Sequence, residues 1–180
     1  MSTYTMFWVG RQTGGSNGRV LNSVDGYNQL YGYWNGFKKQ LYTTGDPAYL
    51  GGYSSDTNWD MFSHSRTSGG AYTMNWNGAA LYSGSSSTGN LLHGLTINAG
   101  DYGEQSDCEV AEIILYNVVL TPAQIAQVEG YLAQKWGFQM PVAHPYYSIS
   151  PAKVMQTNKQ TYADYMLTTC LLYTSDAADE

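Results

Sequence analysis

The 180-residue chain is poor in charged residues, and above all in basic ones. Only 12% of its residues are charged, against about 25% in an average soluble protein, and only eight are Lys or Arg. These eight are scattered singly apart from Lys38-Lys39, so no basic stripe is available to neutralise phosphates. We therefore expect no nucleic acid partner.

Long apolar runs and a signal peptide are also missing. No run approaches the roughly 20 apolar residues that a membrane-spanning helix needs, so we expect no membrane span. The N-terminal residues lack the basic segment, the apolar core and the cleavage site of a signal peptide. Export is thus neither indicated nor excluded, because the natural start of the protein can lie upstream of Met1.

Cysteine is scarce, and one of the two cysteines lies in an unusual C-terminal segment. Residues 170–180 resemble, in order, the translation of a transposase mosaic-end sequencing adapter. If that segment is an artefact, Cys108 is alone and no internal disulfide can form. We therefore divide the chain into a folded domain over 1–150, the start of a linker or further segment over 151–169, and an adapter-derived tail over 170–180. The alternative is a genuine acidic C-terminus.

What the chain does contain is a succession of short alternating segments separated by turn residues. Tyr4–Arg11 carries bulky side chains on both faces, as in a central strand of a sandwich. Asn77-Gly78 lies between two alternating segments and favours the positive φ angles of a type I′ hairpin turn. Further strands are expected at residues 19–23, 29–34, 91–98 and 108–117. This pattern predicts an all-β fold, a two-sheet antiparallel jelly-roll β-sandwich.

A single α-helix is expected near the C-terminal end of the domain, over about residues 121–136. Thr121 and Gln124 form a capping-box pattern, Pro122 suits the first helical turn, and Gly137 can end the helix. An apolar stripe along it is expected to lie against the sandwich. Its members are Ile125, Val128, Leu132 and Trp136.

The segment that contains this helix carries a family resemblance. A Glu-containing strand ends in Tyr116-Asn117, the helix starts after Leu120, residues 129–137 read EGYLAQKWG, and His144-Pro-Tyr146 follows. This pattern resembles the closing segment of concanavalin A-like, laminin-G-like domains of bacterial surface and phage proteins. The likeness extends loosely back to Tyr4. In that family a further strand usually precedes the first one found here, so the resemblance implies that the domain lacks its first strand.

The resemblance implies a binding module and suggests its surroundings. We expect a non-catalytic carbohydrate- or surface-binding module of a larger attachment protein, such as a phage tail or virion component or a bacterial adhesin. The expected location is the extracellular or virion surface, and the expected partners are a glycan or cell-surface ligand and other subunits of a multimeric fibre. Two alternatives stay open: a purely structural sandwich domain without a ligand, and a glycoside hydrolase of the same fold.

Aromatic residues gather between positions 27 and 59, among Gly, Asn and Ser. Rings flanked by amides and hydroxyls suit stacking on sugars, although burial in the core is the simpler explanation for most of them. The candidate ligand-binding residues are Tyr31, Tyr33, Trp34, Tyr53 and Trp59.

Oxygen-bearing side chains gather in the loop before the last strand. Sandwiches of this family often bind calcium on rim loops, and Asp101, Glu104 and Asp107 could supply the several oxygen ligands that calcium needs. No cofactor is required by the sequence, and solvated turn acids are the alternative. The histidines at positions 64, 93 and 144 have no metal-ligand spacing and are expected in loops or in packing.

The last strand also contains the acidic residues that would have to serve as catalytic residues in a glycoside hydrolase. Glucanases of this fold place acidic residues at alternate strand positions, so that a nucleophile and an acid share one face. Here Asp107 and Glu109 are two apart, Ala111 takes the next position, and Glu112 is expected to point the opposite way. A catalytic pair is therefore possible only as Asp107 with Glu109. We assign no catalytic residue and expect that the chain is not an enzyme.

Overall fold

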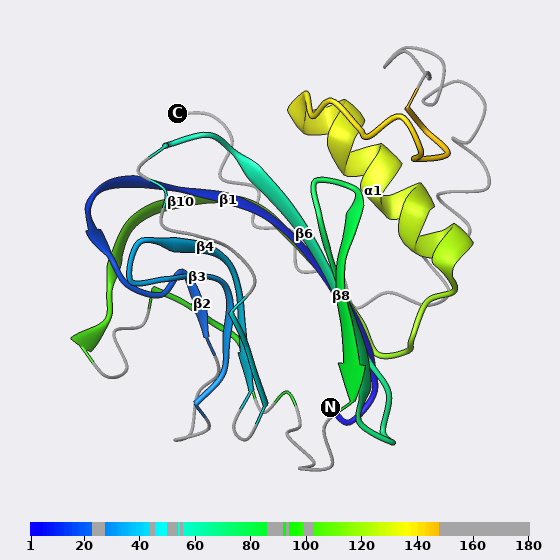
Figure 1. Cartoon of the computed structure of the whole chain (residues 1–180), viewed down its shortest axis with the longest axis horizontal. Helices are drawn as coiled ribbons and strands as arrows, with labels where there is room; N and C mark the ends of the chain where they lie inside the picture. Colours follow the sequence, from blue (N-terminus) through cyan, green and yellow to red (C-terminus); the bar gives the residue numbers. More distant parts are fainter. Residues whose placement is uncertain are drawn as a thin grey trace, which may run out of the picture.

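The protein is a β-sandwich with one helix on its outside (Figure 1). The computed structural model describes residues 1–22, 28–43, 46–49, 54, 56–85, 92, 94–98 and 103–147. One sheet has the strand order β10-β1-β6-β7-β8 and the other β5-β4-β3-β2-β9, and the pairings are antiparallel. The predicted all-β fold class is confirmed. The proposed linker and tail over 151–180 lie outside the described residues.

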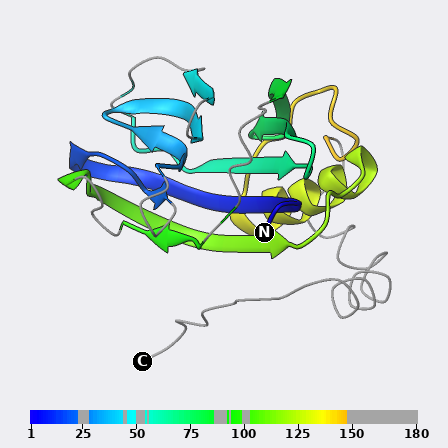
Figure 2. The same ribbon diagram turned by 90° about the horizontal axis from the view of Figure 1, so that it is seen from below.

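The elements have the following bounds. The strands are β1 (Tyr4–Asn17), β2 (Leu21–Asn22), β3 (Leu30–Trp34), β4 (Phe37–Thr43), β5 (Asp46–Tyr49), β6 (Asp60–Arg66), β7 (Ala71–Trp76), β8 (Ala79–Ser85), β9 (Thr96–Ile97) and β10 (Ser106–Tyr116), and the helix is α1 (Pro122–Trp136). Figure 2 shows β10, β1 and β6 running side by side, with α1 next to one end of these strands. No helix in the described part of the chain has the length and apolar character needed to cross a membrane.

Strand β1 separates two hydrophobic cores, as its alternation of bulky residues predicts. Tyr4, Met6 and Trp8 lie in the core between the two sheets, where Trp8 stacks on Phe62 with ring centroids 4.5 Å apart. Phe7 belongs to a second core on the opposite face of the same sheet. A strand buried on both faces can sit only inside the molecule, and β1 accordingly pairs with a strand on each side.

Helix α1 covers the second core. Thr121 accepts a hydrogen bond from the backbone N–H of Gln124 and completes the predicted capping box, and Gly137 ends the helix with a left-handed φ of 77°. Val128 and Leu132 are buried against the sheet, as predicted. The prediction is wrong for Trp136, which is 39% exposed. The last helical turn reaches the sheet edge, where the Trp136 indole lies along β10 instead of between the layers.

The predicted hairpin is present, and the short strands are shorter than expected. Asn77 and Gly78 have φ angles of 48° and 77°, as a type I′ turn requires. Strand β1 runs beyond the predicted Tyr4–Arg11 segment as far as Asn17, with an irregular register beyond Gln12. Strands β2 and β9 contribute two residues each to the pairing.

Candidate functional site

Two of the five candidate aromatic residues are core residues. Tyr31 and Tyr33 are 1% and 0% exposed, and both belong to the core between the sheets. The Tyr33 ring meets Trp8 edge-on at 5.6 Å, and the Tyr31 hydroxyl lies 3.3 Å from that of Tyr4. A buried ring cannot stack on a ligand, so burial in the core, the alternative considered for these residues, is correct for both.

Trp34, at the end of β3, is different because its half-buried indole meets an acidic side chain. Its Nε1 donates to the Glu104 carboxylate at 3.2 Å. The same carboxylate accepts from Arg19 Nε at 2.5 Å, and Arg19 Nη1 donates to Asn28 Oδ1 at 2.5 Å. We call Trp34, Glu104, Arg19 and Asn28 the Trp34 cluster. The structure thus brings together one residue of the aromatic group and one of the acidic loop.

Backbone contacts between distant segments build the Trp34 cluster. Arg19 N donates to the Glu104 carbonyl at 2.6 Å, and Gly18 N donates to the Gln105 carbonyl at 3.2 Å. A Cβ on Gly18 would lie 2.1 Å from the Glu104 carbonyl oxygen, so only glycine permits this approach. Gly36, in the turn after Trp34, donates to the Asn17 carbonyl at 2.8 Å. These bonds hold the end of β3, residues 17–19 and residues 104–105 against one another.

The electrostatics of the Trp34 cluster suit a fixed polar surface beside an aromatic ring. The Arg19 side chain is 7% exposed and the Glu104 side chain 31% exposed. A buried guanidinium needs a carboxylate partner, so Arg19 fixes the position of Glu104. Glu104 in turn orients the indole of Trp34, which leaves a half-buried ring beside the partly exposed Glu104.

Trp59 lies elsewhere, directly before β6. The Arg11 guanidinium lies 4.7 Å from the centre of its ring, and Arg11 also bonds to Glu109 at 2.8 Å. Trp59 is half-buried against the core beneath α1, whereas Trp34 lies on the other sheet. Tyr53 lies outside the described residues. The five candidates therefore do not form one platform.

The structure describes two of the three residues proposed for calcium. Glu104 forms an ion pair with the Arg19 guanidinium at 2.5 Å. Asp107 is exposed, and its Oδ2 accepts from Ser16 N at 3.0 Å. Asp101 lies outside the described residues, and within the described ones no three His, Cys, Asp or Glu residues gather in a way that could hold a metal ion.

Glu112 lies on the opposite face from the one predicted. Val9 pairs with Glu112 but Gly10 pairs with Val110, so Ala111 is an extra residue in β10 and reverses the alternation after it. Glu112 therefore points towards α1, where it accepts from Trp136 Nε1 at 2.7 Å. Tyr131 and Lys135 also bond to this carboxylate, at 3.3 and 3.2 Å.

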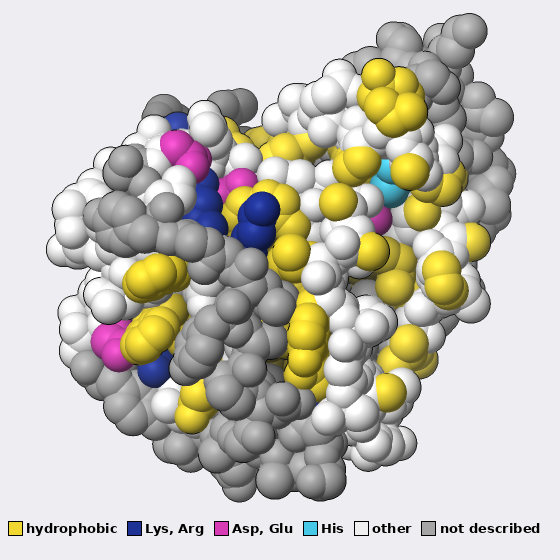
Figure 3. All heavy atoms as spheres, in the orientation of Figure 1, with side chains coloured by type: hydrophobic (Ala, Val, Ile, Leu, Met, Phe, Trp, Pro, Cys, Tyr) yellow, Lys and Arg dark blue, Asp and Glu magenta, His cyan; other side chains and the backbone are white. Residues whose placement is uncertain are grey.

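A second polar group, which the sequence did not reveal, lies between the sheets. Lys38 is buried, and its Nζ bonds to Asp60 at 2.9 Å and to Asp56 at 2.5 Å. The hydrogen bond from Lys38 lowers the pKa of Asp56 to about 2, whereas burial raises the pKa of Asp60. Tyr33 donates to Asp60, and burial raises the pKa of this phenol. On the face shown in Figure 3, basic and acidic side chains likewise lie together in small groups.

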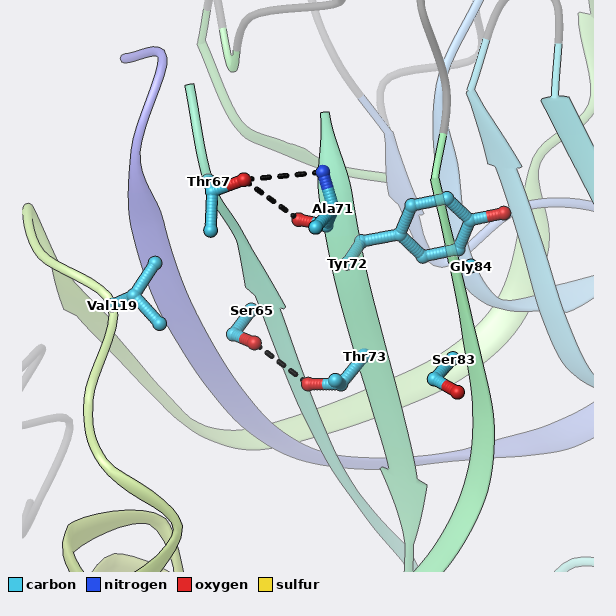
Figure 4. Close-up of a pocket in the computed structure, with 8 residues that line it drawn as sticks. All are labelled: Ser65, Thr67, Ala71, Tyr72, Thr73, Ser83, Gly84 and Val119. Atoms are coloured by element: carbon cyan, nitrogen blue, oxygen red, sulfur yellow. Dashed lines mark hydrogen bonds between the residues drawn. The ribbon is translucent and has the colours of Figure 1, made fainter. Parts of the chain in front are cut away.

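A shallow hollow lies on the outer face of β6, β7 and β8 (Figure 4). Its volume is about 390 Å³. Hydroxyl groups line it, and they bond within the protein: Ser65 Oγ lies 2.6 Å from Thr73 Oγ1, and Thr67 accepts from the N–H of Ala71 at 3.1 Å. Val119, from the segment before α1, borders the other side.

Comparison with known proteins shows the fold alone. No family model and no curated protein matches this sequence. Domain 4 of a GH43 extracellular arabinanase from Geobacillus stearothermophilus, solved with arabinotriose, has a TM-score of 0.52 at 13% identity, over 69% of this chain and 65% of that one. A Bacteroides ovatus protein described as carbohydrate binding has a TM-score of 0.52 at 13% identity, over 69% of this chain and 40% of that one. The binding domain of Paraclostridial mosquitocidal protein 1 has a TM-score of 0.53 at 11% identity, over 73% of this chain and 37% of that one.

Proposed function

We propose that the domain is a non-catalytic saccharide-binding module of a larger attachment protein at the extracellular or virion surface, and that the Trp34 cluster binds the saccharide. The observation that carries this proposal is the half-buried Trp34 indole, held in place by Glu104. No other candidate aromatic residue in the described part of the chain combines partial exposure with a carboxylate bonded to its own ring nitrogen.

The chemistry of the cluster supports a sugar better than a purely apolar ligand. A sugar ring presents C–H groups to an aromatic face and hydroxyls around its rim. Beside Trp34, the half-buried Glu104 carboxylate can accept hydrogen bonds from such hydroxyls, and the half-buried Asn28 amide is bonded to the same Arg19. Because Arg19 holds Glu104 in position, a ligand need not order these groups itself, which reduces the entropy lost on binding.

The structural neighbours support the same class of ligand. One of them was solved with arabinotriose, and another is described as carbohydrate binding. This chain spans 65% and 40% of those chains, so the likeness concerns part of each neighbour. A structural sandwich domain without a ligand is the competing proposal.

Binding to the full chain tests the proposal directly. Arabinotriose and a glycan array serve as probes, and we expect affinities in the micromolar to millimolar range, about −8 to −4 kcal/mol. Trp34→Ala should weaken binding at least tenfold and change the melting temperature little, because the ring is only half-buried. Trp136→Ala removes an exposed indole on the helix side and serves as the matched control, with unchanged affinity.

Two results would contradict the proposal. If no glycan binds the folded full chain, the domain is a structural sandwich. If Trp34→Ala binds as tightly as the unmodified protein, the saccharide site lies elsewhere. Release of reducing sugar from β-glucans would contradict the non-catalytic part alone.

A further inference from the structure

Two ion pairs at the β3–β4 hairpin expose their acids and bury their bases. In the pair of Arg19 with Glu104, the side chains are 7% and 31% exposed, respectively. In the pair of Lys38 with Asp56, they are 7% and 42% exposed. A ligand that approaches either pair therefore meets a carboxylate before it meets a cation.

Both exposed acids are tied to the turn that joins β3 to β4. Glu104 accepts from Trp34 Nε1 at 3.2 Å. Ser54 N donates to the Gly36 carbonyl at 3.0 Å, and Ser54 Oγ donates to the Asp56 carboxylate. These bonds keep the two carboxylates close to the turn.

The Glu104 carboxylate keeps one oxygen for a ligand. Trp34 and Arg19 both donate to its Oε2, and no hydrogen bond within the described part of the chain ends on its Oε1. A carboxylate accepts hydrogen bonds through both of its oxygens. Oε1 can therefore accept from a ligand that lies beside the Trp34 ring.

The other basic side chains that the structure describes are engaged elsewhere. Arg11 bonds to Glu109, Lys39 lies over the Trp76 ring, Arg66 is buried on β6 and Lys135 bonds to Glu112 beside α1. Among the described residues, the basic side chain that contacts Trp34 and Glu104 together is thus the buried Arg19. A sugar carboxylate at this site would meet like charge.

We propose that the saccharide bound at the Trp34 cluster carries a protonated amino group, as a glucosamine unit with a free amine does. This inference rests on the proposed function, because it names the class of ligand for the same site. An ammonium group is attracted by the face of an indole and forms charge-assisted hydrogen bonds with a carboxylate. Trp34 and Glu104 are in direct contact, so one ammonium group can reach both.

Titration calorimetry of the full chain with three trisaccharides tests this inference. The probes are the glucosamine trimer, its N-acetylated form and a galacturonate trimer, in a buffer in which the amine is protonated. The first two share one backbone and differ in the charge of the substituent at C2. We expect the free amine to bind about tenfold more tightly than the acetylated form and the galacturonate trimer to bind most weakly. High salt should reduce the advantage of the amine, because it screens exposed charges.

The matched variants are Glu104→Gln and Glu109→Gln, which remove the same charge from similar side chains. The first should lose most of the preference for the amine. The second removes an exposed acid that pairs with Arg11, beside Trp59, and should keep the preference. Melting curves establish that each variant is folded.

The outcomes separate this inference from the proposed function. Equal affinity for the amine and its acetylated form, or tightest binding of galacturonate, overturns the inference and leaves saccharide binding in place. A preference that survives in folded Glu104→Gln also overturns it. If this variant does not fold, an advantage of the amine that high salt does not reduce overturns it in the unmodified protein. Failure of every saccharide to bind overturns both proposals.

Discussion

His64, on β6, lies in the core with both ring nitrogens bonded. Its Nδ1 is 2.9 Å from the Thr73 carbonyl and its Nε2 is 3.2 Å from the Tyr4 hydroxyl. A carbonyl only accepts, so Nδ1 carries the hydrogen and Nε2 accepts from Tyr4. Burial lowers the pKa of His64 from its ordinary 6.5 to about 4, and the ring is neutral near pH 7.

Stability should therefore fall as the solution is acidified. Between pH 6.5 and pH 4 the unfolded chain protonates this histidine and the folded protein does not, so protons favour unfolding. The free energy of unfolding should keep its full value, as far as His64 determines it, above pH 6.5. It should fall by a total of about 3 kcal/mol as the pH is lowered to 4. Urea titrations across this range measure it.

The matched variant for this prediction is His64→Gln. It should be less stable at pH 7 but lose less stability than the unmodified protein between pH 6.5 and pH 5, because the titrating ring is gone. The difference between the two curves isolates the histidine from carboxylates that titrate at lower pH. Identical pH dependence in the two proteins would show that His64 is not the cause.

At the level of single residues, the alternation of side chains along a strand predicted the correct face of the sheet only where the strand was regular. Tyr4, Met6 and Trp8 lie on one face as predicted, because β1 pairs without interruption through Val9. Glu112 was misplaced because an extra residue at Ala111 reverses the alternation. A bulge arises from pairing with a strand distant in sequence, and the residues of β10 alone carry no sign of it.

At the level of the element, the residues of the apolar stripe on α1 should contribute unequally to the stability of the protein. Leu132→Ala removes a fully buried side chain and should cost about 2–5 kcal/mol. Trp136→Ala should cost less than about 1.5 kcal/mol, because the ring is 39% exposed and loses chiefly its hydrogen bond to Glu112. Chemical denaturation of both variants measures the difference. Equal costs would mean that Trp136 is packed more tightly than the structure shows.

The same helix shows which features local sequence can predict. Thr121, Gln124 and Gly137 act through neighbouring backbone groups, so the capping signals predicted both ends correctly. Trp136 could be buried only if the sheet extended beneath it. The sheet ends at β10, which is its edge strand, so the indole stays partly exposed. Helical periodicity describes one face of a helix and not the extent of the surface it meets.

At the level of the whole molecule, Glu129 connects α1 to three other parts of the fold. It is 2% exposed and accepts from Ser63 Oγ at 2.6 Å and from Asn75 Nδ2 at 2.8 Å, on β6 and β7. His144 Nδ1 accepts from Tyr146 N, so its Nε2 carries the hydrogen and donates to Glu129 at 3.2 Å. The residues that gave the family resemblance at 129–137 thus hold the helix and the following segment on the sandwich.

Removing this connection should destabilise the protein strongly. Glu129→Ala leaves a buried hydroxyl, amide and imidazole without their acceptor, at a cost of about 3–5 kcal/mol. Glu109→Ala is the control, since it breaks an exposed ion pair with Arg11 and should cost less than about 1 kcal/mol. Urea denaturation compares the two, and limited proteolysis should show faster cleavage after α1 in the Glu129 variant only. Similar stabilities would mean that Glu129 does not hold these parts together.

The fold class was predictable from sequence, and so were Trp34 and Glu104 as separate candidates, but their contact was not. The Asn77-Gly78 turn and the alternating segments act over short distances and are visible in a single chain. The Trp34 cluster depends on bonds between Arg19 and Glu104, which are 85 positions apart. Nothing in the spacing of these residues indicates that they meet, and Lys38 with Asp60 is a second case of the same kind.

Of the three Asn-Gly pairs, at 17–18, 35–36 and 77–78, the two that form turns, Asn35-Gly36 and Asn77-Gly78, have consequences for chemical ageing. In an Asn-Gly pair the glycine N–H can attack the asparagine amide carbon and expel ammonia, and the cyclic imide then opens to aspartate or isoaspartate. Asn77 resists this, because its Oδ1 accepts from Met61 N at 2.7 Å and Met140 packs on Gly78. Asn35 is exposed, but the attacking Gly36 N donates to the Asn17 carbonyl at 2.8 Å, which holds it away from the Asn35 amide. Both turns should therefore deamidate faster in the unfolded chain than in the folded one, so isoaspartate at position 77 records the time that the chain has spent unfolded.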